Sequence, residues 1–218
     1  MKRLLVLGAL AAAIIAPSAQ ATNECRGLTV CVPVAGPWVV TTSSARIEYD
    51  LSCPARFVVA GLDAELSTRA IDIGFVGGMG APVNPGITTQ RDAVFLGRVV
   101  GSSKAVATFR PHVGCVPAAG GGQRAPTAYD VFAPGHPVDR RVHEFAAHGS
   151  RTVSARCPRG EVLRTATHAI GFYRPTPPTA AAVQAVRVTQ STHAGVVTLR
   201  IRSTVDAVVQ LDLLCVAR

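Results

Sequence analysis

The chain has 218 residues, of which 48% are hydrophobic and 16% charged, and its formal net charge is +9 at pH 7. This apolar and weakly charged composition excludes a disordered chain, and the 20 glycines follow no collagen period. The length fits one large or two small globular domains.

Residues 1–21 are typical of a signal peptide. A basic start, Met1-Lys2-Arg3, is followed by the apolar run Leu4 to Ala16 and by the small-x-small cleavage site Ala19-Gln20-Ala21. An apolar run of about 13 residues is shorter than the ~20 that a bilayer requires, and no later stretch is long and apolar enough. We therefore expect cleavage after Ala21 and a secreted protein, extracellular or in the cell envelope, with no transmembrane segment.

Alternating apolar and polar side chains predict strands with one buried face along the rest of the chain. The clearest strands, in chain order, are 46–53, 107–115, 152–157, 186–189, 197–202 and 205–215. Their polar positions, which we expect to face solvent, include Glu48, Asp50, Thr108, Arg110, His112, Asp206, Gln210 and Asp212. The Ala-rich run 180–185 is short and follows two prolines, so no helix is predicted there. Short strands between Gly and Pro turns indicate an all-β fold.

Short motifs recur along the chain and predict two copies of one unit. Ser52-Cys53-Pro54 recurs as Arg156-Cys157-Pro158, and Gly114-Cys115-Val116 recurs as Leu214-Cys215-Val216. We expect two β-sandwich units, residues 22–117 and 138–218, joined by a Gly- and Pro-rich linker, 118–137. The units are either in tandem or packed as one pseudo-twofold body.

The six cysteines form an even set in a chain expected to be exported, which favours disulfides. The repeated interval of about 60 residues selects Cys53 with Cys115 and Cys157 with Cys215, leaving Cys25 with Cys31. The alternative follows the other repeated interval and pairs Cys31 with Cys53 and Cys115 with Cys157.

The repeated Cys-Pro, apolar strand and closing Cys-Val resemble a loose group of bacterial exported proteins built from duplicated, disulfide-closed β units. This resemblance covers most of the mature chain and implies export and a β-sandwich, and it brings no catalytic residues with it. Those proteins often have glycine two residues after the proline, where this sequence has Arg56 in one unit and Gly160 in the other.

Cleavage would lower the net charge to +7, and the only lysine left would be Lys104. Arginine binds carboxylate and phosphate through paired donors, so an anionic cell-envelope polymer, or another protein, is a suitable partner. Nucleic acid is not expected, because the basic residues are spread along the chain and aromatic residues make up only 5% of it.

The motifs for catalysis are incomplete, so we assign no catalytic, cofactor-binding or metal-binding residue. His143 and His148 are five residues apart, whereas a zinc-protease helix needs four, and His136 adds a third imidazole nearby. Ser150 lacks the second glycine of a nucleophile elbow. The sequence predicts an exported, non-enzymatic binding or structural module. The alternative is a secreted hydrolase that uses His136, His143 or His148 with a neighbouring acid.

A binding surface is instead expected on the glycine-rich loop 77–89. Loops on a rigid scaffold often carry binding sites. Trp38 is a candidate aromatic contact for such a surface, although burial in the core is the commoner fate of a single tryptophan. Neither the ligand nor the oligomeric state follows from the sequence.

Overall fold

The structure, a computed structural model, describes residues 22–28, 30–77, 91–101, 106–118 and 138–218. The expected signal peptide, His136, almost all of the expected linker and most of loop 77–89 lie outside these described residues. In the described part no helix is long and apolar enough to cross a membrane.

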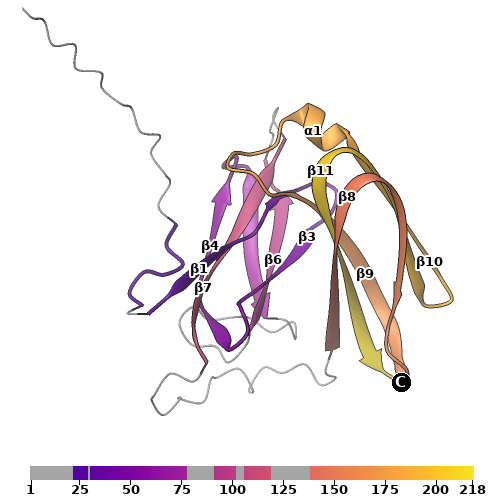
Figure 1. Cartoon of the computed structure of the whole chain (residues 1–218), viewed down its shortest axis with the longest axis horizontal. Coiled ribbons are helices and arrows are strands. Elements are labelled where there is room, and N and C mark those ends of the chain that lie inside the picture. The colour runs from indigo at the N-terminus through magenta and orange to yellow at the C-terminus, as the bar shows by residue number, and fades with distance from the viewer. Residues whose placement is uncertain (1–21, 29, 78–90, 102–105, 119–137) are drawn as a thin grey trace, which may run out of the picture.

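The regular secondary structure of the described residues is almost entirely antiparallel β-strand, which confirms the predicted all-β class (Figure 1). The strands before residue 118 are β1 (Val32–Ala35), β2 (Trp38–Val40), β3 (Ile47–Ser52), β4 (Phe57–Leu66), β5 (Ile71–Gly77), β6 (Asp92–Val99) and β7 (Thr108–Pro117). The elements after residue 137 are β8 (Val138–Arg156), β9 (Glu161–Phe172), α1 (Ala180–Gln184), β10 (Val186–His193) and β11 (Val196–Ala217).

Helix α1 corrects one prediction, since no helix was expected in the Ala-rich run. Thr179 caps this single short helix by accepting a hydrogen bond from the Ala182 amide at 3.3 Å. Alanine has the highest helix propensity, and a threonine N-cap satisfies one of the free amides of the first turn. Together they are sufficient for one helical turn between β9 and β10.

In the first half of the chain, two sets of strands enclose one core. Strands β3, β6 and β5 form a three-stranded sheet, while β7 pairs with β4 along one edge and with β1 and β2 along the other. The side chains of Tyr49, Phe95 and Phe109 are fully buried in the core. The Cys53–Cys115 disulfide joins the end of β3 to β7 and so connects the two sheets.

In the second half, the long strands β8 and β11 bend and fold the sheet over itself (Figure 1). Residues 196–203 of β11 lie between β10 and β8, and residues 208–216 lie between β8 and β9. The register breaks between Ser203 and Ala207, where β11 exchanges β10 for β9 as a neighbour. Leu199, Ile201, Leu211 and Leu213 from both arms of β11 are buried in one cluster.

The two halves share several details of strand pairing. Val59 of β4 faces Cys115, and the register then shifts so that Gly61 faces Gly114. In β9, Leu163 faces Cys215, and the register shifts at the same place so that Thr165 faces Leu214.

The turns before β4 and β9 are also alike. Arg56 and Gly160 both have positive φ angles, of 69° and 92°. The two turns close with matching hydrogen bonds, from the Phe57 amide to the Pro54 carbonyl and from the Glu161 amide to the Pro158 carbonyl, each 3.1 Å long. The residue at this position therefore has a left-handed conformation in both halves, including the first, where it is Arg56 and not glycine.

The three disulfides are Cys25–Cys31, Cys53–Cys115 and Cys157–Cys215, which confirms the preferred pairing over the alternative. Their presence is typical of proteins from an oxidising compartment.

The short strand β2 joins the two halves into one continuous sheet. Val39 pairs with Phe109 of β7 on one side and with Gly171 of β9 on the other. Trp38 pairs with Phe172 and is only 4% exposed. Trp38 is therefore part of the core at this junction and is not an exposed aromatic contact.

Candidate functional site

One surface of the second half gathers arginine and hydroxyl side chains on three paired strands. We call it the basic face, and it consists of Ser150, Thr152, Ser154 and Arg156 of β8, Arg187, Thr189, Ser191 and His193 of β10, and Val196, Thr198, Arg200 and Arg202 of β11. These are alternate residues on neighbouring strands, so their side chains project from the same side of the sheet. The face contains no aspartate or glutamate.

The register brings the arginines of the basic face close together. Arg187 and Arg202 are direct partners across β10 and β11, and Arg200 projects on the same side two residues along β11. Side chains directly opposite on antiparallel strands lie about 5 Å apart at their Cβ atoms, and like charges in that arrangement are destabilising. Among the described residues, none of the face's four arginines forms an ion pair.

The opposite side of the same strands explains why these residues are held in place. Val197, Leu199 and Ile201 alternate with the exposed residues of β11 and are 0%, 0% and 1% exposed. A slip of one residue would bury the arginines and expose these apolar side chains, so the pairing register is strongly fixed. The arrangement can present several guanidinium groups and hydroxyls at once to an extended anion.

The histidines of the hydrolase hypothesis do not come together in the described part of the chain. His148 Nδ1 lies 3.0 Å from Asp206 Oδ1, with side chains 72% and 96% exposed. His143 instead stacks with Phe145, with ring centroids 6.3 Å apart. No group of three potential metal ligands occurs among the described residues, and His136 lies outside them.

The prediction that the strand carboxylates all face solvent is wrong for Asp50 and Asp212. Asp50 is 8% exposed and Asp212 is 3% exposed, whereas Asp206 is exposed as expected. The outer side of β3 is covered by the second half of the chain, and alternation within one strand carries no information about this second layer. Gln210, also expected to face solvent, donates to the Asp50 carbonyl at 2.9 Å and accepts from the Asp50 amide at 2.6 Å.

This covered region is a polar seam between the two halves. Arg140 of β8 donates to Glu48 of β3 at 2.8 Å and also to Asp212 of β11. Tyr49 donates to Glu144 at 2.7 Å, and burial of its hydroxyl is the main reason that its pKa is raised far above the usual value. Burial also raises the pKa of Asp50 to about 7, with a further increase from the nearby Asp92 carboxylate. Glu48, Glu144 and Asp212 therefore take part in contacts that connect the two halves.

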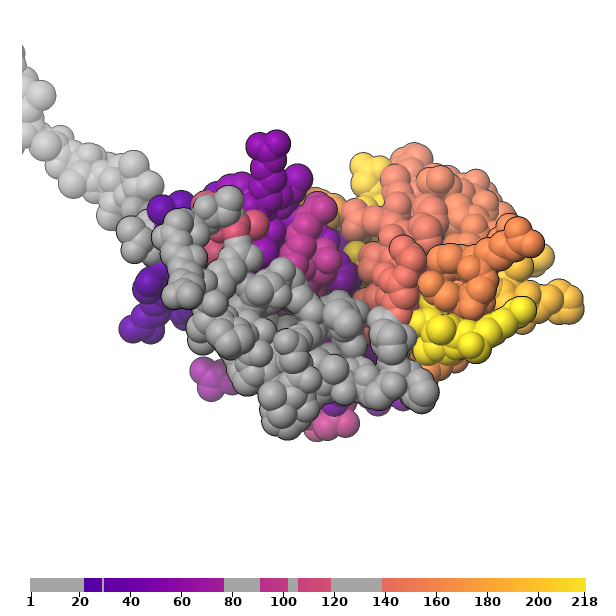
Figure 2. Space-filling model, turned by 90° about the horizontal axis from the view of Figure 1, so that it is seen from below, coloured from indigo at the N-terminus to yellow at the C-terminus, as the bar shows by residue number. Residues whose placement is uncertain are grey.

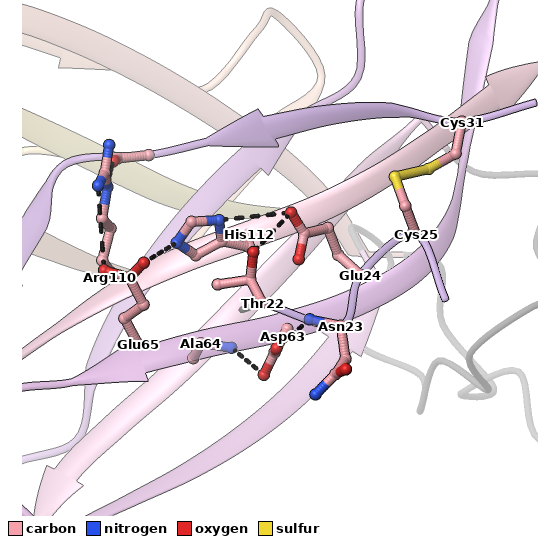
Figure 3. Close-up of polar contacts among 11 residues, drawn as sticks. Thr22, Asn23, Glu24, Cys25, Cys31, Asp63, Ala64, Glu65, Arg110 and His112 are labelled. Carbon is pink, nitrogen blue, oxygen red and sulfur yellow. Dashed lines mark hydrogen bonds and ion pairs between the residues drawn. A yellow bond between two sulfur atoms is a disulfide. The ribbon is translucent and has the colours of Figure 1, made fainter. Parts of the chain in front are cut away.

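A second buried cluster surrounds His112 of β7, which was also expected to face solvent (Figure 3). Its Nδ1 atom lies 3.7 Å from Glu24 Oε1, and its Nε2 atom lies 3.6 Å from Glu65 Oε1. Burial lowers the pKa of His112, although the two carboxylates act in the opposite direction. The covering segment is the N-terminal stretch around Glu24, which is itself only 5% exposed.

Further contacts hold this N-terminal stretch in place. The Asn23 amide donates to Asp63 at 2.6 Å, and the Thr22 hydroxyl donates to Glu24 at 3.0 Å. The Cys25–Cys31 disulfide closes the segment just beyond Glu24 (Figure 3). Since Glu24 and His112 are almost fully buried, this cluster holds the N-terminal stretch on β4 and β7.

Sequence reasoning treated the arginines as spread along the chain and so missed the basic face. One signal was present in the sequence, because Arg200 and Arg202 alternate with the apolar Leu199 and Ile201 in a predicted strand. The contribution of Arg187 depends on the pairing of β10 with β11, which alternation alone does not specify. Comparisons with protein-family models, curated proteins and solved structures find no match to this chain.

Proposed function

We propose that this protein is an exported, non-enzymatic binding module of the cell envelope or extracellular space, and that its basic face binds an anionic polymer. The observation that carries the proposal is the direct pairing of Arg187 with Arg202, beside Arg200, on a face with no carboxylate. Guanidinium groups bind phosphate and carboxylate through paired donors, and the surrounding hydroxyls add further hydrogen bonds. A polyanion would offset the repulsion among these arginines.

Export is part of the same proposal. It is supported by the signal-like residues 1–21 and by the three disulfides, which take up all six cysteines. The scaffold we propose is a pair of related β-sandwich units, supported by the matching turns and register shifts at Cys115 and Cys215. On this view the basic face belongs to the outer sheet of the second unit.

The test compares two triple variants with the same change in charge. The first, Arg187→Gln, Arg200→Gln and Arg202→Gln, removes the cluster from the basic face. The control, Arg46→Gln, Arg69→Gln and Arg174→Gln, removes three exposed arginines from other parts of the surface. Retention is measured on immobilised polyphosphate and on polygalacturonate, which offer phosphate and carboxylate separately, over a series of salt concentrations.

We expect the unaltered protein to be retained at low salt and released as salt rises, because counterions compete for the arginines. The basic-face variant should bind at least about tenfold more weakly, equivalent to about 1.4 kcal/mol, and the control variant should bind nearly as well as the unaltered protein. Equal losses in the two variants would show that only net charge matters, and the basic face would then not be the binding site.

The second candidate is a secreted hydrolase, and the His148–Asp206 pair is the observation that favours it. An acid that orients an imidazole is one part of a general-base system. Turnover of ester or peptide substrates that is abolished by His148→Ala or Asp206→Asn, with the unfolding temperature unchanged, would support this candidate over the binding module.

A further inference from the structure

The second half of the chain also contains a hollow at one end of its sheet, which shares Arg156 with the basic face but none of Arg187, Arg200 and Arg202. It has a volume of about 1070 Å³ and lies where β9 begins and β11 ends, around the Cys157–Gly160 turn. Figure 2 shows this end of the molecule, with the last residues of β11 in yellow beside β8 and β9 in salmon and orange. The basic side chains that line it are Arg141, His143, Arg156, Arg159 and Arg218.

Three segments of the fold bring these basic side chains to one place. Arg141 and His143 pair with Leu213 and Leu211, so they project from the inner side of β8, where the sheet folds over itself. Arg159 belongs to the turn between β8 and β9, which the Cys157–Cys215 disulfide fixes to β11. Thr192 of β10 and Ala194 and Gly195 of the turn to β11 also line the hollow.

The charges around the hollow are strongly unbalanced. Glu161 is the one carboxylate side chain among the residues that line it in the described part of the chain. Arg141 forms an ion pair with Asp139, whereas Arg156, Arg159 and Arg218 form none with described residues. The guanidinium groups therefore exceed the available counter-charge, and the hollow is open enough for a ligand to supply it.

We propose that this hollow binds a compact, multiply charged anion, namely a phosphate group carried by a monoester or free in solution. Several guanidinium groups can each donate to a different oxygen of a phosphate, and its double negative charge offsets more than one arginine. A single carboxylate has fewer acceptor positions and half the charge. The ligand is smaller than the polymer proposed for the basic face, and its binding does not require that polymer.

Phosphate binding is measured directly by isothermal titration calorimetry. The full chain is titrated at low salt with inorganic phosphate and, separately, with phenyl phosphate. We expect one saturable site, and tighter binding of phenyl phosphate would identify a monoester as the favoured source. Arg159→Gln should weaken binding at least tenfold, since it removes a donor with no ion pair among the described residues. Glu161→Gln should strengthen binding several-fold, because it removes the one carboxylate side chain among the described residues that line the hollow.

Two control variants test whether phosphate binding depends on the hollow itself, and not on net charge or on the basic face. Arg69→Gln removes one positive charge from the first half of the chain, and Arg187→Gln removes one from the basic face. Both variants should bind phosphate within about twofold of the unaltered protein. Polymer retention should in turn be weakened in the basic-face variant and kept in Arg159→Gln, so the failure of one proposal can be distinguished from the failure of the other. The absence of saturable phosphate binding, or equal weakening by Arg159→Gln and Arg69→Gln, would overturn the assignment of the hollow.

Discussion

Gly61 of β4 and Gly114 of β7 face each other across the strand pair, and the carbonyl oxygen of Glu24 lies against both of them. A Cβ atom added at Gly61 would lie 1.7 Å from that oxygen, and one added at Gly114 would lie 2.1 Å from it. The two glycines therefore form a slot for the backbone of the N-terminal stretch. In the second half, the positions with the same register are Thr165 and Leu214, whose side chains would fill such a slot.

Gly114→Ala should displace the N-terminal stretch, because the new methyl group meets backbone that cannot rotate away. Overpacking of this kind costs about 1–3 kcal/mol, and the change should also expose His112. Urea unfolding measures the loss, and proteolysis near Glu24 reports the displacement. Gly74→Ala is the matched control, since its nearest neighbour would be 3.8 Å away, and it should leave both readings unchanged. Equal stability of the two variants would contradict the slot.

Arg140→Leu should be strongly destabilising, because it leaves Glu48 and Asp212 without their shared partner. The side chains of Arg140 and Asp212 are 6% and 4% exposed, and removing one partner from a buried ion pair typically costs about 3–5 kcal/mol. The added change Asp212→Asn should recover part of this loss by neutralising the acid left behind. Thermal unfolding checks the order of the three proteins, and the prediction is wrong if the double variant is the least stable.

Several strand positions were predictable from this sequence because apolar side chains alternate along those strands. Alternation in residues 205–215 and 197–202 predicted two strands, which the structure joins into the single bent strand β11. Asp50 and Asp212 were misplaced for a different reason. They lie on the polar side of their own strands. That side is buried only because β3 packs against the second half of the chain, which the pattern within one strand does not show.

Asp50→Asn should stabilise the protein above pH 7. The pKa of Asp50 is raised from 3.8 to about 7 by burial, so between these values the folded state binds more protons than the unfolded chain. Stability contributed by this group is therefore present below pH 3.8 and is lost as the pH rises toward 7. The unfolding temperature of the variant should exceed that of the unaltered protein at pH 8 and approach it at pH 4. Asp72→Asn, at a side chain 51% exposed, should show no such pH-dependent gain.

His112→Gln should change the pH profile in the opposite sense. Burial lowers the pKa of His112 below 6.5, so below that pH the unfolded chain binds more protons and the folded state loses stability as the pH falls. One such group contributes at most about 1.4 kcal/mol per pH unit. The two groups act in opposite directions as the pH falls below 6.5, so each variant should reveal the effect of the group that remains. As the pH falls, His112→Gln should therefore become more stable and Asp50→Asn should become less stable. Urea unfolding at several pH values measures both changes.

Little of the candidate site was predictable from the sequence. Arg187 and Arg202 are neighbours only because β10 and β11 pair across the Ala194-Gly195 turn, and the arginines of the hollow come from strands that meet through the bend in β11. His143 and His148, named in the alternative hydrolase hypothesis, lie apart for a local reason. Residues five apart on a strand project to opposite sides, and His143 and His148 do so on β8.

Removing each disulfide in turn should lower the free energy of unfolding by an amount that increases with the length of the loop that the bridge closes. Cys53–Cys115 and Cys157–Cys215 span 62 and 58 residues, while Cys25–Cys31 spans 6. Chain entropy assigns about 4 kcal/mol to each long bridge and about 2 kcal/mol to the short one. Paired Cys→Ala variants should follow this order in urea unfolding, with Cys157→Ala/Cys215→Ala also weakening phosphate binding, because that bridge fixes the turn that carries Arg159.

The short Cys25–Cys31 bridge is the control for the two long bridges in this experiment. Loss of Cys25–Cys31 should free the N-terminal stretch and expose His112 without altering phosphate or polymer binding, since both proposed sites lie in the second half. If its removal instead cost as much stability as either long bridge, loop entropy would not account for the difference. The contacts of Glu24 with His112, Gly61 and Gly114 would then be a principal source of stability in the first half.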